Sequence, residues 1–127
     1  MIFAALVLVI ACNEEDLGPR QQDKQNYALV DFDRIEAEDA LILTINYGEN
    51  FSIVAEGDRR NLDDLRVLKN GNSLQLSFNQ SKKRQYETSV TITMPVLNGI
   101  SLSGASNARI AGYANSPRMD FSLSGAS

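Results

Sequence analysis

The sequence predicts an all-β domain whose second half winds as a parallel β-solenoid. The hexapeptide Ser-Leu-Ser-Gly-Ala-Ser occurs twice, at Ser101–Ser106 and again 21 residues later at Ser122–Ser127. A repeat of this length suits one coil of a β-solenoid, and it is too short for a two-helix repeat or a propeller blade. From Leu29 onward, apolar residues also alternate with polar ones, the period of half-buried strands.

The composition limits the chemistry that the chain can carry out. With 127 residues, 22% of them charged and 43% hydrophobic, it forms one folded domain at most. The net charge of -4 gives no reason to expect a nucleic-acid partner, because a polyanion needs a basic surface. Histidine is absent and there is one cysteine, which excludes zinc sites, Ser-His-Asp triads and Cys-His dyads. Carboxylate chemistry is the main enzymatic option left.

Residues 1–11 are predicted to be a signal peptide. The apolar run Ile2–Ala11 covers about 15 Å as a helix, too little to cross a bilayer. Val9, Ile10 and Ala11 precede Cys12 and resemble a bacterial lipobox, the recognition sequence of signal peptidase II, with Cys12 as the lipid attachment site. No Lys or Arg precedes the run, and the alternative is a buried core strand with a free thiol.

Residues 12–28 are predicted to be a lipidated polar tether. Asn13-Glu14-Glu15-Asp16 follows the cysteine directly, and the polar stretch with Gly18 and Pro19 continues through Asn26, which is typical of a solvated linker. The acidic cluster also resembles the surface-export signal of Bacteroidota-type lipoproteins. A tether that faces the periplasm is the alternative. The folded domain is expected at residues 29–127.

The first half of this domain is predicted to consist mainly of hairpins. Alternating apolar runs cover residues 41–46, 51–56, 74–79 and 90–94. Residues 47–50 have a length suited to a hairpin loop, and Asn70-Gly71 is a strong signal for a tight turn. Residues 61–65 could form one helical turn with Asn61 as its cap. The polar segment 80–85, with Lys82-Lys83-Arg84, is expected to be an exposed loop.

The second half is predicted to stack in parallel coils. In each copy of the hexapeptide the leucine should point inward and the serines outward, while Gly-Ala-Ser turns a corner where only small side chains fit. Residues 108–112 would form a second strand in the same coil. Leu102 should then lie over Leu123, and Ile100 over Phe121. The connections are too short for helical crossovers, which excludes a doubly wound α/β sheet.

A family resemblance rests on many short motifs in a fixed order. They are Phe32-Asp33-Arg34-Ile35, Tyr47-Gly48-Glu49-Asn50-Phe51, Glu56-Gly57-Asp58, Asn61-Leu62-Asp63-Asp64-Leu65, Asn70-Gly71-Asn72-Ser73-Leu74, Met94-Pro95-Val96-Leu97 and Ile100–Ser106. From about Phe32 to the end, the chain resembles the putative auto-transporter adhesin, head GIN domain family. The resemblance implies a right-handed β-solenoid-like domain on secreted or lipid-anchored bacterial proteins, and no catalytic residues.

This resemblance also bears on how the chain ends. Members of the family continue through further coils, whereas this sequence stops at Ser127 in mid-coil. A solenoid without a capping coil leaves an open edge that can pair with other strands. We therefore expect a chain truncated at the C-terminus. The alternative is a short natural protein whose edge is covered by a partner.

Several polar groups are candidate sites. Asp31 and Asp33, and the cluster Asp58, Asp63 and Asp64, could serve glycosidic acid–base chemistry or hold calcium, but solvated loops and turn caps explain them better. We therefore predict no catalytic residue, no metal and no cofactor. Lys82-Lys83-Arg84 could meet lipid phosphates, although a solvated loop is favoured. The candidate ligand face is a ladder of four outward serines that could bind an extended glycan or polymer: Ser101, Ser103, Ser122 and Ser124.

The predicted function is that of a non-enzymatic, lipid-anchored module for adhesion or surface contact. Its partners would be the membrane, through the anchor, and a glycan or surface protein, with the oligomeric state left open. We expect an outer-membrane location that faces the periplasm or the cell exterior. The rival is a carbohydrate-active β-helix enzyme, a polysaccharide lyase or hydrolase, with Asp58 or Asp63 opposite Lys or Arg. A signalling or envelope-stress accessory lipoprotein is a third alternative.

Overall fold

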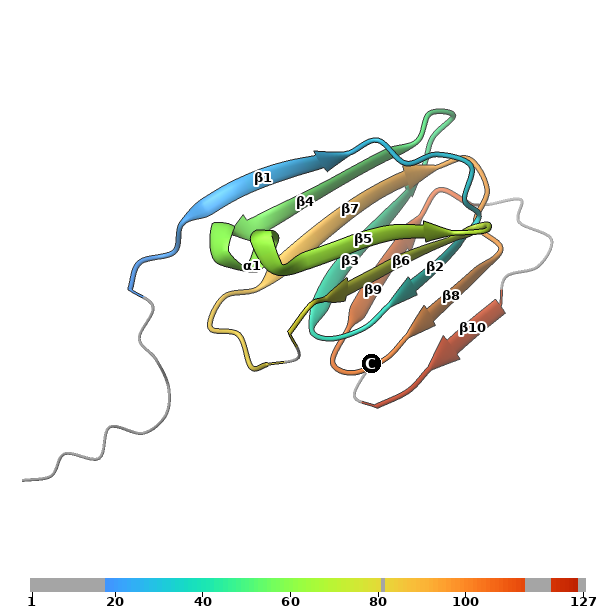
Figure 1. Cartoon of the computed structure of the whole chain (residues 1–127). Coiled ribbons are helices and arrows are strands. Elements are labelled where there is room, and N and C mark those ends of the chain that lie inside the picture. The colour runs from blue at the N-terminus through green and yellow to red at the C-terminus, as the bar shows by residue number, and fades with distance from the viewer. Residues whose placement is uncertain (1–17, 81, 114–119, 126–127) are drawn as a thin grey trace, which may run out of the picture.

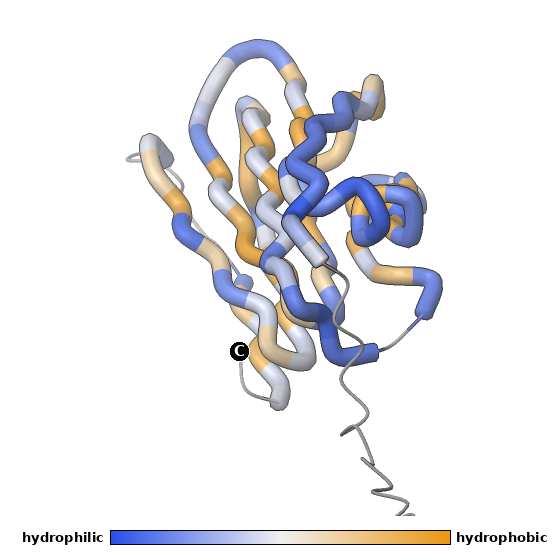
Figure 2. Tube along the Cα trace, turned by 90° about the vertical axis from the view of Figure 1, so that its left-hand side faces the viewer, coloured by the Kyte–Doolittle hydropathy of each residue, from blue (hydrophilic) through white to orange (hydrophobic). Residues whose placement is uncertain are grey.

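The computed structural model describes residues 18–80, 82–113 and 120–125, which form two five-stranded sheets and one short helix. The sheets face each other and enclose the apolar residues between them (Figures 1 and 2). The predicted signal peptide and the lipid attachment site at Cys12 lie outside the described residues. In the described part, no helix is long and apolar enough to cross a membrane.

The first sheet has the strand order β1-β4-β7-β3-β9. Its strands are β1 (Gln22–Tyr27), β4 (Ser52–Asp58), β7 (Thr88–Met94), β3 (Leu41–Tyr47) and β9 (Asn107–Ala111). The second sheet has the order β10-β8-β2-β6-β5. Its strands are β10 (Asp120–Leu123), β8 (Gly99–Leu102), β2 (Arg34–Ala37), β6 (Ser73–Phe78) and β5 (Leu65–Asn70).

Parallel pairing joins the two copies of the hexapeptide, as predicted. β10 pairs with β8, and the register places Leu123 beside Leu102 and Phe121 beside Ile100. β8 in turn pairs in parallel with β2, and β9 with β3. On the opposite side, β6 pairs in parallel with β2 and β7 with β3. The prediction of an all-β chain is confirmed. The sheets are not closed, and right-handed solenoid winding stays a prediction.

The expected hairpin around residues 47–50 is wrong. β3 and β4 are consecutive in the sequence, but β7 lies between them, parallel to β3 and antiparallel to β4. In this position β7 satisfies its backbone groups along both edges, which a hairpin of β3 and β4 would prevent. The hairpin of β5 and β6 is confirmed, and its two loop residues are Gly71 and Asn72. Gly71 has a φ of 61°, as the first loop position of a type II′ turn requires.

The polar tether is shorter than the sequence suggests. Residues 22–27 form β1, an edge strand that pairs antiparallel with β4 from Gln22 beside Asp58 to Tyr27 beside Ile53. Most of its side chains are exposed, so its sequence lacks the apolar alternation of the inner strands. Lys24 forms an ion pair with Glu56 at 3.2 Å. The backbone of β1 covers an edge that β4 would otherwise leave open.

The apolar core lies between the sheets and follows the alternation of each strand. Every second residue of β3 and β7 is almost fully buried, and the same holds for β2 and β6. Phe32 packs edge-on against Phe51, with ring centres 4.9 Å apart. The largest fully buried side chains are Phe32, Ile35, Leu41, Leu43, Ile45, Ile53, Leu74, Leu76, Val90, Ile92, Met94 and Leu97.

A column of left-handed residues turns the corner after β2, β8 and β10. Asp39, Gly104 and Gly125 have φ values of 65°, 67° and 68°. A Cβ at Gly104 would lie 3.2 Å from the backbone nitrogen of Asp39, and one at Gly125 would lie 3.2 Å from that of Gly104. The predicted need for small residues at this corner is therefore confirmed at Gly104. Asp39 is accommodated because its carboxylate accepts a hydrogen bond from the Phe78 backbone.

The helical turn begins earlier than predicted. Helix α1 spans Arg59–Asp64, and its N-cap is Asp58 rather than Asn61. Asp58 has extended backbone angles, and its Oδ1 accepts a hydrogen bond of 3.0 Å from the backbone nitrogen of Arg60, which is the geometry of an N-cap. Asn61 lies within α1 and is buried, and its Nδ2 donates a hydrogen bond of 3.1 Å to the backbone oxygen of Tyr86.

Candidate functional site

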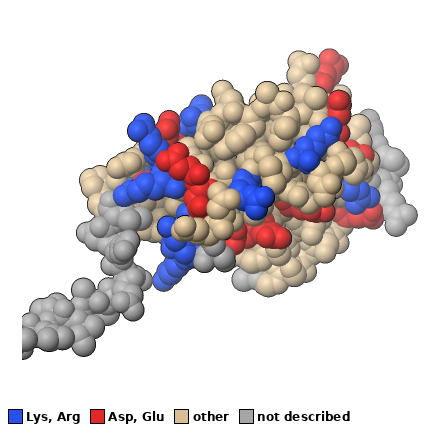
Figure 3. All heavy atoms as spheres, in the orientation of Figure 1, with Lys and Arg blue, Asp and Glu red and all other residues tan. Residues whose placement is uncertain are grey.

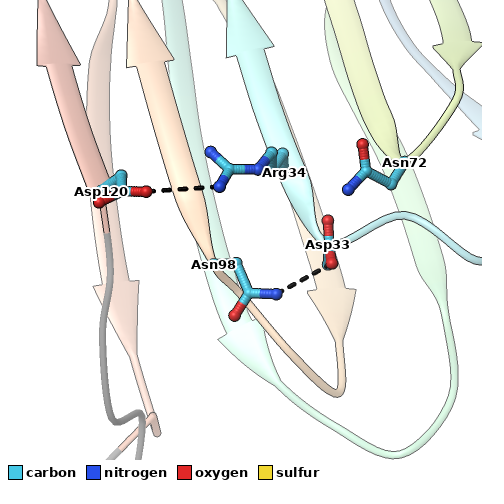
Figure 4. Close-up of a pocket in the computed structure, with 5 residues that line it drawn as sticks. All are labelled: Asp33, Arg34, Asn72, Asn98 and Asp120. Carbon is cyan, nitrogen blue, oxygen red and sulfur yellow. Dashed lines mark hydrogen bonds and ion pairs between the residues drawn. The ribbon is translucent and has the colours of Figure 1, made fainter.

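The parallel strands of the second sheet begin at one edge and bring polar side chains together there. Asn72, Asp33 and Asn98 directly precede β6, β2 and β8, and Asp120 is the first residue of β10. Together with Arg34 they line an open depression of about 460 Å³ (Figure 4). We call these five residues the ladder pocket, because they come from neighbouring rungs of the sheet.

Hydrogen bonds tie the rungs of the ladder pocket together. The backbone nitrogen of Asp33 donates to the oxygen of Asn72 at 2.9 Å, that of Asn98 to Asp33 at 2.7 Å, and that of Asp120 to Asn98 at 2.9 Å. Between side chains, Nδ2 of Asn98 donates to Oδ2 of Asp33 at 2.9 Å (Figure 4). The backbone under the pocket is therefore fixed, while the side chain of the exposed Asn72 lies beside Asp33.

The second carboxylate oxygen of Asp33 is unsatisfied. Its Oδ1 is buried and has no hydrogen-bond partner among the residues that the structure describes. A buried acceptor without a donor costs on the order of 1 to 3 kcal/mol. This oxygen is the strongest indication in the ladder pocket that a further donor belongs there.

Arg34 reaches across one strand to hold Asp120. The register places Arg34 beside Gly99 and Gly99 beside Asp120, so the ion pair passes over β8. Nη2 of Arg34 lies 3.3 Å from Oδ2 of Asp120 (Figure 4). A Cβ at residue 99 would lie 2.5 Å from Nη1 of Arg34, so glycine leaves the path open. Both side chains are about half exposed, and such a pair contributes at most about 1 kcal/mol.

The predicted serines lie beside the ladder pocket. Ser101 pairs with Ser122 on the outer side of the sheet, next to Glu36 on β2. Ser103 and Ser124 follow the same strands, and their backbone nitrogens donate to Ala37 and Leu102. Ser122 and Ser124 are exposed, whereas Ser101 and Ser103 are half-buried. A smaller depression of about 110 Å³, lined in part by Arg34, Asp120, Ser101 and Ser122, adjoins the pocket. A ligand role for these serines stays a prediction.

Of the five acidic residues that the sequence singled out, only Asp33 lines one of the two depressions described above. Asp31 and Asp33, which the sequence would place on the same side of one strand, both precede β2 and lie in no strand. Asp58 is 1% exposed, and its carboxylate accepts two hydrogen bonds of 2.8 Å from Nε and Nη2 of Arg60. These bonds hold the pKa of Asp58 well below its ordinary value. Asp63 is exposed, and neither depression includes it or Asp58.

Arg84 corrects the expectation of a fully exposed basic loop. Lys82 and Lys83 are exposed, but the Arg84 side chain is 7% exposed and pairs with Asp64 of α1. Nη1 of Arg84 also donates to Oδ1 of Asn61 at 3.0 Å, and its guanidinium carbon lies 3.8 Å from the centre of the Phe78 ring. The pKa of Asp64 is lowered even though burial raises it, because Arg84 and the Gln80 backbone donate hydrogen bonds to it.

Four residues of the ladder pocket were not identified from the sequence: Arg34, Asn72, Asn98 and Asp120. One signal was available, since Asp33, Asn72 and Asn98 each stand two residues before an aliphatic residue, at Ile35, Leu74 and Ile100. Among the described residues there is no cluster of three or more acidic, cysteine or histidine side chains suited to a metal ion. The surface in the view of Figure 3 mixes acidic and basic side chains. The residues that line the pocket offer hydrogen-bond donors and acceptors.

A family model matches residues 31–127, and its description is putative auto-transporter adhesin, head GIN domain. The chain belongs to this family. The family resemblance found in the sequence is thereby confirmed, and membership favours adhesion over catalysis. No curated protein matches the chain.

Solved structures share the fold of this head GIN chain. A putative adhesin from Bacteroides fragilis is 24% identical with a TM-score of 0.64, and the match covers 75% of this chain and 47% of that one. A putative adhesin from Parabacteroides merdae is 16% identical with a TM-score of 0.61, covering 71% and 39%. A putative lipid binding protein from Parabacteroides distasonis is 13% identical with a TM-score of 0.70, covering 81% and 46%. The chain spans less than half the length of each.

Proposed function

We propose that this head GIN chain is a non-enzymatic adhesion or surface-contact module of the bacterial cell envelope. Its membership of an adhesin family is the observation that carries the proposal. The outer side of the second sheet supports it, because strands β2, β8 and β10 present aligned polar side chains in a fixed register. We also propose that these parallel strands belong to a right-handed solenoid.

The proposed attachment to the membrane is through a lipid on Cys12. The apolar residues 2–11 and the lipobox-like Val9-Ile10-Ala11 support cleavage by signal peptidase II before this cysteine. Because Gly18, Pro19 and Gln21 are hydrogen-bonded to the folded domain, the tether between the lipid and the domain would span residues 13–17. Five residues reach about 17 Å at most. This reach would keep the domain close to the outer membrane, on its periplasmic or its outer side.

Catalysis by a carbohydrate-active enzyme is less favoured by the site. A general acid needs a proton to give, and the Arg60 hydrogen bonds keep Asp58 ionised. Burial raises the pKa of Asp64, but Nη2 of Arg84 pairs with this carboxylate and likewise lowers its pKa. Turnover of a polysaccharide that is lost in Asp63→Asn would reverse this preference.

The anchor can be tested by metabolic labelling with an alkyne analogue of palmitate. The full chain, expressed in a bacterium with lipoprotein processing, should take up the label, and Cys12→Ser should abolish it. Ser122→Ala is the matched control and should be labelled like the native chain. An unlabelled native chain would remove the anchor from the proposal.

The contact function can be tested on whole cells. Cells that express the full chain should adhere to glycoprotein-coated surfaces more strongly than cells that lack it, and Cys12→Ser should release both the protein and the adhesion. Equal adherence of cells with and without the chain would contradict a contact role.

A further inference from the structure

We propose that the ladder pocket binds the hydroxyl groups of a neutral saccharide. This inference deepens the proposed function, on which it rests, because it names the class of ligand that the contact face would recognise. The site differs from the serine ladder that the sequence indicates, although the two adjoin at Arg34 and Asp120. Three observations carry it: the set of polar groups, the unsatisfied oxygen of Asp33, and the charge balance.

The polar groups of the pocket match what a pair of hydroxyls needs. A hydroxyl donates one hydrogen bond and accepts others, so it is best bound by a carboxylate together with an amide or a guanidinium. Asp33 and Asp120 accept, Arg34 donates, and the exposed amide of Asn72 can do both (Figure 4). These groups come from neighbouring strands whose backbones are hydrogen-bonded to one another, so the pocket is largely preformed.

Asp33 provides the focus of the site. Its Oδ2 is held by Asn98 at 2.9 Å, while its Oδ1 has no partner among the described residues. Because Oδ1 is buried, the Asp33 side chain would have to turn toward the depression before a ligand hydroxyl could donate to it. The charge-assisted bond formed in this way is about twice as strong as a neutral one. The orphan acceptor thus favours a ligand that donates hydrogen bonds over one that only accepts them.

The charge of the pocket selects against acidic sugars. Two carboxylates and one guanidinium line it, and the guanidinium already pairs with Asp120 at 3.3 Å. An anionic ligand would have to approach Asp33 and Asp120 against their repulsion. We therefore expect neutral hexoses to bind and uronic acids to bind less well.

The shape of the site sets the affinity. A volume of about 460 Å³ falls in the range of small-molecule sites, which is roughly 300 to 1,000 Å³. Its five lining residues include no aromatic ring on which a sugar could stack. An open polar pocket of this kind should bind a single sugar in the millimolar range, at about −4 kcal/mol.

The test uses the folded full chain labelled with ¹⁵N, and methyl β-D-galactopyranoside and methyl α-D-mannopyranoside as probes at about 10 mM. Each sugar is titrated while the side-chain amide signals of Asn72 and Asn98 are followed by NMR. We expect at least one of the neutral sugars to shift both signals in a saturable manner. Glucuronic acid should bind at least about threefold more weakly. If neither neutral sugar moves these signals, or if glucuronic acid binds as well, the proposal is overturned.

Three variants locate the binding. Asn72→Ala removes an exposed amide and should weaken binding about fivefold, since one hydrogen bond is worth about 1 kcal/mol. Asp33→Asn should weaken it more, because it removes the charged acceptor. Asn107→Ala is the matched control, an exposed asparagine on β9 of the other sheet, and should leave the affinity unchanged. Equal affinity in Asn72→Ala and Asn107→Ala would overturn the assignment to this pocket.

The experiments distinguish failure of the sugar site from failure of the proposed contact function. Labelling of Cys12 and adherence of whole cells do not require an occupied ladder pocket. Adherence that survives Asn72→Ala together with absent sugar shifts would leave the contact role standing and overturn only the sugar site. Saturable sugar shifts in a chain that gives cells no adherence would support the sugar site and contradict the contact role.

Discussion

Gly104 and Gly71 show that glycine serves two different needs in this molecule. Both have a positive φ, 67° and 61°. A Cβ at Gly104 would meet the backbone of Asp39 on the neighbouring rung, whereas one at Gly71 would find nothing within 4 Å. The loop glycine is therefore required for its own conformation alone. The corner glycine is also required by the rung beside it.

We predict that Gly104→Ala destabilises the fold more than Gly71→Ala. The left-handed conformation costs alanine about 1 to 2 kcal/mol at either site. At residue 104 the contact with backbone atoms at 3.2 Å adds to this cost, because backbone cannot move aside as a flexible side chain can. Urea unfolding of both variants measures the difference. Equal losses of unfolding free energy in the two variants would mean that residue 104 is not packed against the backbone of Asp39 as described.

Asp58 is predicted to make stability depend on pH. Hydrogen bonds from the Arg60 side chain lower its pKa, burial raises it, and backbone bonds from Gln21 and Arg60 lower it further, with a net fall below the ordinary 3.8. A carboxyl group with a depressed folded pKa stabilises the native state above the unfolded pKa. That contribution is lost as the pH falls below about 4 toward the folded pKa.

Asp58→Asn tests this dependence, because asparagine caps helices as well as aspartate does. The variant should be less stable at pH 7, by about 1 to 3 kcal/mol. The difference in stability between the native protein and the variant should become smaller as the pH is lowered from 5 to 2. Thermal unfolding at each pH measures this difference. Asp64 also has a lowered pKa, so the variant should keep part of the acid sensitivity. A gap that stays constant over this range would contradict the prediction.

Among the elements, α1 depends on a segment distant in sequence. Arg84 lies between β6 and β7 and is held by Asp64 and Asn61 of the helix and by the Phe78 ring. A helix of six residues has little stability of its own, so tertiary contacts of this kind must hold it.

We predict that Arg84→Lys loosens α1 and the segment 82–87 together. Lysine keeps the charge but loses the planar fork that binds two acceptors at once. The loss should be about 2 kcal/mol, within the range for breaking a buried charged network. Faster amide hydrogen exchange in residues 59–64 and 82–87 would show it. Lys82→Ala, an exposed neighbour, is the control and should leave exchange unchanged. Unchanged exchange in Arg84→Lys would show that Arg84 does not hold α1.

Local sequence patterns predicted the positions of individual strands better than they predicted which strands pair with one another. The alternation of apolar residues located β3, β4, β6 and β7, and the hexapeptide repeat gave the register of β8 and β10. The insertion of β7 between β3 and β4 has no local signal, because it depends on which backbone edges meet after folding. The polar edge strand β1 was missed for the same reason. The burial of Arg84 was missed because its partners Asp64 and Asn61 lie about 20 residues away in the sequence. The ladder pocket arises from strand starts that only the parallel stacking brings together.

On the scale of the whole molecule, the two sides of the described strand stack differ. On one side, β5 and β1 cover the edges of β6 and β4. On the other, β10 lies on β8 in the second sheet, while β9 is the last strand of the first (Figure 1). Phe121 and Leu123 of β10 are each 61% exposed, whereas their partners Ile100 and Leu102 are 4% and 5% exposed. The repeated hexapeptide therefore lies in two different environments.

This asymmetry predicts opposite outcomes for one substitution made in two copies of the same motif. Leu102→Ala should cost about 2 to 4 kcal/mol, because it leaves a cavity between the sheets. Leu123→Ala should change stability by no more than about 0.5 kcal/mol, since the side chain is mostly in water. Because Ser-Leu-Ser-Gly-Ala-Ser surrounds both leucines, local propensity is the same and cancels from the comparison. Urea unfolding of the full chain measures both losses. Equal losses of unfolding free energy would contradict the difference in burial between Leu102 and Leu123.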